Sequence, residues 1–179
     1  MKKLIYILLF LPSSLLGQSA MESLSNMERL ERDFGRNRLS GEQLEAFSLR
    51  AEQKLKDFCE YTLVLADTAY PAEMLDHLEG MARASFSDGK TPVLGMSLEA
   101  FFTALRNAQL SPIKLDPNSF AWQQGLSPNN AQRQLGRLSF RDERGKTYLA
   151  QISLAYLPKK FGKETQYVWT LLLEEIWQV

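Results

Sequence analysis

The sequence predicts an α+β protein in which a helical hairpin and a short third helix pack on an antiparallel sheet. Between residues 40 and 88, apolar residues recur in steps of three and four, as on one face of a helix. From residue 112 onward, prolines and glycines become frequent and apolar residues alternate with polar ones, as in half-buried strands. Helices that come first and strands that come last are typical of the α+β class.

Residues 1–19 are expected to form a signal peptide for export. Two lysines precede the apolar run Leu4 to Leu11, and small residues follow, so that a signal peptidase could cut after Gly17 or Ser19. A membrane anchor is the alternative, but a spanning helix needs about 20 apolar residues and this run is shorter. We therefore expect a periplasmic or secreted protein that does not span the membrane once the signal peptide is removed.

The remaining chain is expected to hold a leader or short helix at 20–39 and a single domain at 40–179. The chain has 21 basic and 21 acidic residues, and two of its lysines lie in the signal peptide, which leaves a net charge of −2. The basic residues are scattered, so we expect no nucleic-acid partner. One cysteine excludes an internal disulfide, and one cysteine with one histidine argues against a dedicated metal site.

The hairpin is predicted from its capping residues and its apolar faces. Ser40 and Gln43 have the spacing of a capping box, which satisfies backbone N–H groups where a helix begins. One apolar face then continues for about seven turns along these residues: Leu44, Phe47, Ala51, Leu55, Phe58, Thr62, Leu65 and Ala69. Asp67 to Tyr70 should end this helix. Pro71 suits the first turn of a second helix, which Asp88-Gly89 should end.

A short strand and a third helix are expected after the hairpin. Residues 93–96 fit a strand, and Ser97 can cap a helix at 98–105 that carries apolar residues on one face. Phe120 and Trp122 then mark a further strand, because they alternate after an Asp-Pro-Asn turn signal.

Three long strands are expected to complete the sheet. Leu138 and Phe140 precede a polar turn at Asp142 to Gly145. Apolar residues then occupy every second position from Tyr148 to Tyr156. Residues 158–165 read as a second polar connection, and residues 167–177 read as the last strand. Short connections between long strands predict antiparallel pairing.

Several segments of the chain carry a resemblance at the level of the fold: Leu55-Lys56-Asp57-Phe58, Leu65-Ala66-Asp67, Met81 to Phe86, Val93 to Ser97 and Tyr167 to Val179. With the order of the elements, they resemble the nuclear transport factor 2-like superfamily, also called cystatin-like or SnoaL-like. The resemblance covers roughly residues 40–179 and implies a curved sheet that wraps the helices into a cone. Because this superfamily includes enzymes, carriers and interaction modules, the resemblance implies a fold and leaves the function open.

Enzymes of that superfamily use the interior of the cone, where an Asp or His acts as a base and a Tyr or Asp donates a hydrogen bond to the substrate oxygen. The side chains that the sequence offers for these roles are Asp67, His77, Tyr61, Tyr148, Tyr156 and Glu175. None of them lies in a catalytic motif of the family. We therefore predict no catalytic, cofactor-binding or metal-binding residues.

Three residues have both a functional and a purely structural interpretation. His77 lies beside the apolar stripe of the second helix, where a half-wet boundary residue is favoured over a catalytic one. Cys59 lies on the apolar side of the long helix, where a small buried residue is favoured over a reactive thiol.

Glu175 is the third such residue. Alternation places it on one strand face with apolar residues, namely Trp169, Leu171, Leu173 and Trp177. That face either opens into a ligand pocket or ends in solvent, and the second interpretation is favoured because buried carboxylates are rare. The aromatic residues of the last strands are similarly favoured as core over ligand-stacking residues.

These observations favour an exported, non-catalytic binding or interaction module. The alternative is a metal-independent small-molecule isomerase or dehydratase that acts inside the cone. A cavity of about 300 Å³ or more, with a carboxylate or histidine opposite a tyrosine, would favour the enzyme. The other sheet face should be too apolar for open water, because these residues would lie on it: Leu149, Ala155, Leu157, Val168, Leu172 and Ile176. We expect a partner, a second copy of the chain or the 22–39 leader to cover it.

Overall fold

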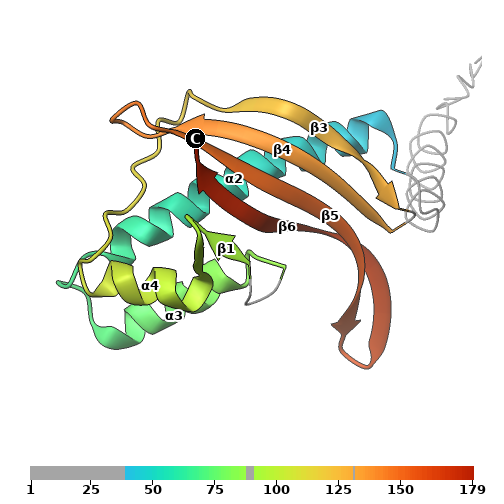
Figure 1. The fold of residues 1–179 in the computed structure, drawn as a ribbon. Coiled ribbons are helices and arrows are strands. Elements are labelled where there is room, and N and C mark those ends of the chain that lie inside the picture. Colours follow the sequence, from blue (N-terminus) through green and yellow to red (C-terminus); the bar gives the residue numbers. More distant parts are fainter. Residues whose placement is uncertain (1–38, 88–90, 131) are drawn as a thin grey trace, which may run out of the picture. The chain divides into compact units, whose positions relative to one another are not determined.

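The computed structural model describes residues 39–87, 91–130 and 132–179. Its elements follow one another along the chain in this order (Figure 1): α2 (Gly41–Leu65), α3 (Ala72–Arg83), β1 (Pro92–Val93), β2 (Met96–Ser97), α4 (Leu98–Arg106), β3 (Ala121–Asn130), β4 (Arg133–Arg141), β5 (Thr147–Phe161) and β6 (Glu164–Gln178). The α+β class is confirmed. The predicted signal peptide and residues 20–38 of the predicted leader lie outside the described residues.

The capping box at the beginning of α2 is confirmed. The backbone N–H of Gln43 donates to the Ser40 hydroxyl at 3.2 Å, and the Ser40 N–H donates to the Gln43 side-chain oxygen at 2.9 Å. The helix ends at Leu65, and the Asp67 carboxylate then accepts a hydrogen bond from the Ala69 N–H at 2.9 Å. Pro71 is the residue just before α3 and not a part of its first turn.

The sheet is mixed, whereas the sequence predicted antiparallel pairing. Its strand order is β2-β1-β6-β5-β4-β3, and β3 to β6 form the predicted antiparallel meander. The exception is β1, which runs parallel to β6 with Val93 opposite Ile176. β1 therefore enters the sheet beside β6, the strand that is farthest from it in the sequence. Leu94 and Gly95, with φ values of 53° and 76°, then turn the chain back into β2.

The predicted polar connection at 158–165 is wrong, because both strands continue through it. β5 runs to Phe161 and β6 begins at Glu164, with Gly162 at a φ of 63° in the tight turn between them. Pairing with β4 stops at Ala155, so residues 157–167 form a two-stranded ribbon that extends beyond the rest of the sheet (Figure 1). All of these residues are exposed, which explains the absence of an alternating apolar pattern. We call residues 157–167 the arm.

One hydrophobic core lies between the helices and the sheet. Phe58 of α2, Phe101 of α4 and Phe140 of β4 are fully buried, together with Ile152 of β5 and Leu173 of β6. Phe58 meets the ring of Phe86 edge-on, with a centroid separation of 5.1 Å. The chain's own side chains therefore fill the centre of the fold, and any ligand site has to lie toward its edge.

Candidate functional site

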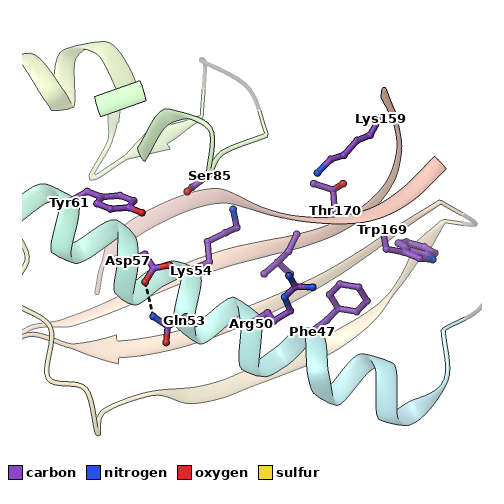
Figure 2. Close-up of a pocket in the computed structure, with 11 residues that line it drawn as sticks. Phe47, Arg50, Gln53, Lys54, Asp57, Tyr61, Ser85, Lys159, Trp169 and Thr170 are labelled. Atoms are coloured by element: carbon purple, nitrogen blue, oxygen red, sulfur yellow. Dashed lines mark hydrogen bonds between the residues drawn. The ribbon is translucent and has the colours of Figure 1, made fainter. Parts of the chain in front are cut away.

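A cleft of about 460 Å³ lies between α2 and the strands β5 and β6. We call it the α2–β6 cleft (Figure 2). The residues that line it are Phe47, Arg50, Gln53, Lys54, Asp57 and Tyr61 from α2, Ser85 from the segment after α3, Lys159 from the arm, and Trp169, Thr170 and Leu171 from β6.

The helical period of α2 determines which of its residues reach this cleft. Phe47, Arg50, Lys54, Asp57 and Tyr61 follow one another in steps of three and four, so they form one stripe on the helix. This stripe lies next to the fully buried stripe that packs on the sheet. A sequence signal for the site therefore exists, namely a charged and aromatic stripe along the flank of an apolar one.

Positive charge dominates the cleft. Arg50, Lys54 and Lys159 line it together with a single carboxylate, that of Asp57, which accepts a hydrogen bond from the Gln53 amide at 2.6 Å. Within the part of the chain that the structure describes, none of the three cations forms an ion pair. Burial lowers the pKa of Lys54, and the charge of Lys159 lowers it further, while Asp57 acts in the opposite direction.

Aromatic side chains supply the apolar walls. Phe47 and Tyr61 are half-buried on α2, and Trp169 of β6 is 7% exposed. The Trp169 ring packs on Tyr156 with a centroid separation of 5.3 Å, which fixes its position at the base of the arm. The cleft thus combines flat apolar surfaces with cationic groups, the composition of a site for a small organic molecule.

The structure does not bring the predicted catalytic candidates together. Of them, only Tyr61 lines the cleft. His77 is exposed on α3, and Asp67 caps the turn after α2. Tyr148 is buried, and its hydroxyl donates to Asp142 at 3.2 Å within the β4–β5 turn.

Two buried groups have strongly raised pKa values. Burial raises the pKa of Tyr148 to about 12, and the charge of Asp142 acts in the same direction. Burial also raises the pKa of Cys59 to about 12. Both groups therefore stay protonated at neutral pH, and Cys59 is a buried apolar residue and not a nucleophile.

The strand face predicted for Glu175 is wrong because β6 contains a β-bulge. Glu175 lies opposite Gln151, but the next pair joins Ile152 to Leu173, which leaves Glu174 as an extra residue. The bulge reverses the alternation, so that Ile176 is fully buried in the core and Glu175 is not on the core face. Strict alternation in the sequence had placed Glu175 on the core face and Ile176 on the other face of the sheet.

Glu174 itself is a residue that sequence reasoning missed. Its carboxylate accepts hydrogen bonds from the hydroxyls of Ser153 and Ser87 and pairs with the Arg133 guanidinium at 2.6 Å. Ser153 is fully buried, and Glu174 retains 14% of its side-chain exposure. The cluster borders a second cavity of about 330 Å³, which is also lined by Ala155, Leu157 and Leu172. It links β4, β5, β6 and the segment after α3.

We expect Glu174→Ala to lower the free energy of unfolding by about 1–3 kcal/mol, because it leaves the buried Ser153 hydroxyl and the Arg133 guanidinium without their shared partner. Urea denaturation monitored by tryptophan fluorescence measures the change. Glu175→Ala is the matched control, with an expected effect within about 0.5 kcal/mol. Equal effects at the two positions would contradict the role assigned to Glu174.

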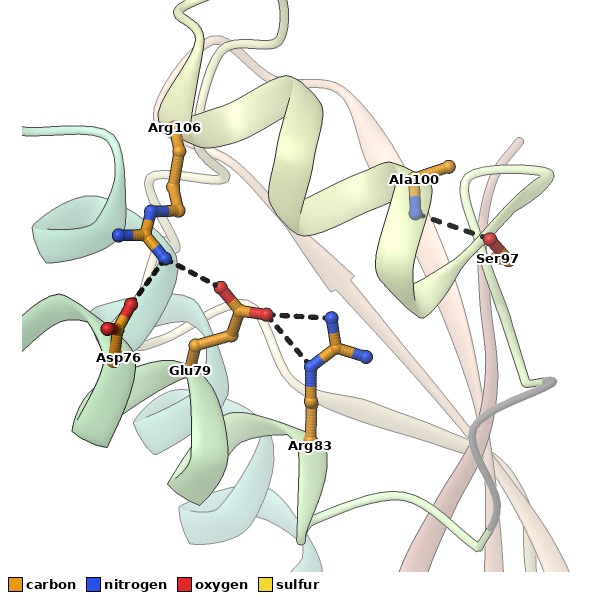
Figure 3. A network of polar contacts seen from close by, with 6 residues as sticks. All are labelled: Asp76, Glu79, Arg83, Ser97, Ala100 and Arg106. Atoms are coloured by element: carbon orange, nitrogen blue, oxygen red, sulfur yellow. Dashed lines mark hydrogen bonds and ion pairs between the residues drawn. The ribbon is translucent and has the colours of Figure 1, made fainter.

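A third polar cluster holds two helices together (Figure 3). Arg106 of α4 contacts Asp76 at 2.7 Å and Glu79 at 3.3 Å, and Glu79 also pairs with Arg83 at 2.7 Å. Ser97 caps α4 by accepting a hydrogen bond from the Ala100 N–H, as predicted. Each charge in this cluster has an opposite partner, so the cluster joins α3 to α4 and leaves no unpaired cation for a ligand.

Comparisons with protein families, with curated proteins and with solved structures give no match to this chain. Within the described residues, no group of His, Cys, Asp or Glu side chains has an arrangement that could hold a metal ion. The helices of the described ranges are also too short or too polar to cross a membrane.

The α2–β6 cleft fits binding better than acid–base chemistry. It contains a carboxylate and a tyrosine, and its volume exceeds the expected threshold of about 300 Å³. However, Asp57 and Tyr61 lie one turn apart on the same helix, so they form part of one wall. A base and an oxyanion donor that act on the same substrate need to approach it from different directions.

Proposed function

We propose that the chain is an exported, non-catalytic binding module of the nuclear transport factor 2-like type, and that a small organic ligand occupies the α2–β6 cleft. The observation that supports this most is the cleft itself, because its volume of about 460 Å³ lies in the range of small-molecule sites and aromatic residues line it. Export rests on the charged and apolar pattern of residues 1–19.

The test uses N-phenyl-1-naphthylamine, a neutral aromatic probe whose fluorescence rises in an apolar site. We expect the purified chain to bind it, and we expect Phe47→Ser to weaken binding about tenfold, because the substitution removes one aromatic wall. Leu49→Ser is the matched control: Leu49 lies on the same helix, is 63% exposed and does not line the cleft. A probe that fails to bind, or that binds equally to both variants, would overturn the proposed site.

A small-molecule isomerase or dehydratase is the second candidate, favoured by the presence of Asp57 and Tyr61 in the cleft. For such an enzyme, Asp57 would be the base and Tyr61 the hydrogen-bond donor. Their placement on one wall is the reason that we rank it second.

The proposal also includes a partner that covers the sheet face opposite the core. This face carries the apolar residues Leu149, Ala155, Leu157, Val168 and Leu172. A second copy of the chain is one such partner. Sedimentation of the purified chain as a monomer would remove that part of the proposal.

A further inference from the structure

We propose that the ligand of the α2–β6 cleft is an organic anion, in which a carboxylate, sulfonate or phosphate group is attached to a flat apolar body. This inference rests on the proposed function and specifies the ligand class of the same site. It follows from the balance of charge in the cleft, from the contrast between the two sides of α2, and from the origin of Lys159.

Cations reach the cleft from two separate elements. Arg50 and Lys54 project from α2, and Lys159 projects from the arm, so the fold brings together charges that are distant in sequence (Figure 2). Asp57 is the one carboxylate among the lining residues, which leaves an excess of two positive charges. Lys54 is half-buried whereas Arg50 and Lys159 are exposed, so water screens the charge of Lys54 least.

Within the described ranges, Asp57 is the one carboxylate that lines the cleft, and none of the three cations forms an ion pair. Lys54 is half-buried, and both its burial and the nearby Lys159 disfavour its charged form. A bound anion would offset this repulsion. The positive charges of the unbound cleft would then be preorganised for the ligand.

The outer side of α2 shows that the excess is specific to the cleft. Lys56 lies two residues beyond Lys54 but points away from the cleft residues, and it pairs with Glu60 at 4.0 Å. An ordinary solvated helix face has this kind of balanced pair. The cleft side of the same helix has no such pair among the described residues, so general enrichment of α2 in lysine does not explain it.

The aromatic residues define the rest of the ligand. Phe47 and Trp169 line the same cleft as the three cations, so a ligand that fills it meets both flat apolar surfaces and positive charge. A small inorganic anion would leave the aromatic walls unused, and a neutral aromatic molecule would leave the cations uncompensated. An amphiphilic organic anion uses both.

The experiment compares two probes with the same aromatic body. 1-Anilinonaphthalene-8-sulfonate is N-phenyl-1-naphthylamine with an added sulfonate, so the difference in affinity reports on the anionic group alone. We expect the wild-type chain to bind the sulfonate more tightly than the neutral probe. In the double variant Lys54→Met and Lys159→Met, sulfonate binding should weaken about tenfold, while the neutral probe should change by less than about twofold.

The matched control is the double variant Lys56→Met and Lys160→Met, which removes the same charge from α2 and the arm but from residues that do not line the cleft. We expect it to bind both probes as the wild type does. Far-ultraviolet circular dichroism checks that each variant is folded. Added salt should weaken binding of the sulfonate and leave the neutral probe unaffected.

The outcomes separate this inference from the proposed function. If the sulfonate binds the Lys54 and Lys159 double variant as tightly as the wild type, the inference is overturned. If the neutral probe still binds in a Phe47-dependent way, the proposed site stands without its preference for anions. If neither probe binds the wild-type chain, both the inference and the proposed function fail.

Discussion

Phe58→Ala is expected to lower the free energy of unfolding by about 3–5 kcal/mol, the range for truncating a fully buried phenylalanine. Phe58 is 0% exposed, and its ring contacts those of Phe86 and Phe101 at centroid separations of 5.1 and 6.0 Å. The substitution removes these contacts and leaves a cavity where α2 meets α4 and the segment after α3. Because domains of this kind are stable by about 5–15 kcal/mol, the loss is a large part of the total.

Urea denaturation at equilibrium measures this change. Leu49→Ala is the matched control, because Leu49 also lies on α2 but is 63% exposed, and its truncation should change stability by less than about 0.5 kcal/mol. A loss below about 1.5 kcal/mol for Phe58→Ala would show that the helices do not pack on one another as described.

Gly136→Val is expected to lower the free energy of unfolding by about 1–3 kcal/mol, because β4 has no room for a side chain there. A Cβ atom at Gly136 would approach Cζ3 of Trp122 to 2.8 Å and the carbonyl oxygen of Gln124 to 3.2 Å. Trp122 would have to move, and its indole N–H donates to Glu52 of α2 at 2.9 Å. The substitution would therefore disturb the contact between β3 and α2 as well.

Gly125→Val is the control for this position. Gly125 lies on the adjacent strand β3, and a Cβ atom there would meet nothing within 4 Å. Urea denaturation should show a clear loss of stability for Gly136→Val and little change for Gly125→Val. Equal stability of the two variants would mean that Trp122 does not cover Gly136.

The helices could be predicted from the sequence because their signals are local. The hydroxyl and amide of the capping box are three residues apart, and the apolar face of α2 repeats every turn. Two features of the sheet could not be predicted in this way. The pairing of Val93 with Ile176 joins residues that are far apart in sequence. The bulge at Glu174 reverses the alternation at two consecutive glutamates, a pattern that a strand end entering solvent would also show.

The candidate site could be predicted only in part. The α2 stripe that contains Arg50 and Lys54 is visible in the sequence as a helical repeat, although a charged stripe is also what a solvated helix face shows. The contribution of Lys159 could not be foreseen, because it depends on how the arm places a residue of β5 near α2. The role of Glu174 could not be predicted from the sequence for a related reason, since its partners come from three other segments.

The position of β6 in the sheet has a consequence for how the chain acquires its structure. β6 lies between β5 and β1, so it is the common neighbour of the strand that immediately precedes it in the sequence and of a strand made much earlier in translation. At about 5–20 residues per second, several seconds separate the synthesis of β1 from that of β6. Until β6 has left the ribosome, β1 has no parallel neighbour and one edge of β5 is unpaired. The pairing of β1 with β6 should therefore form only after translation of β6, whereas β3, β4 and β5 can pair with one another before it.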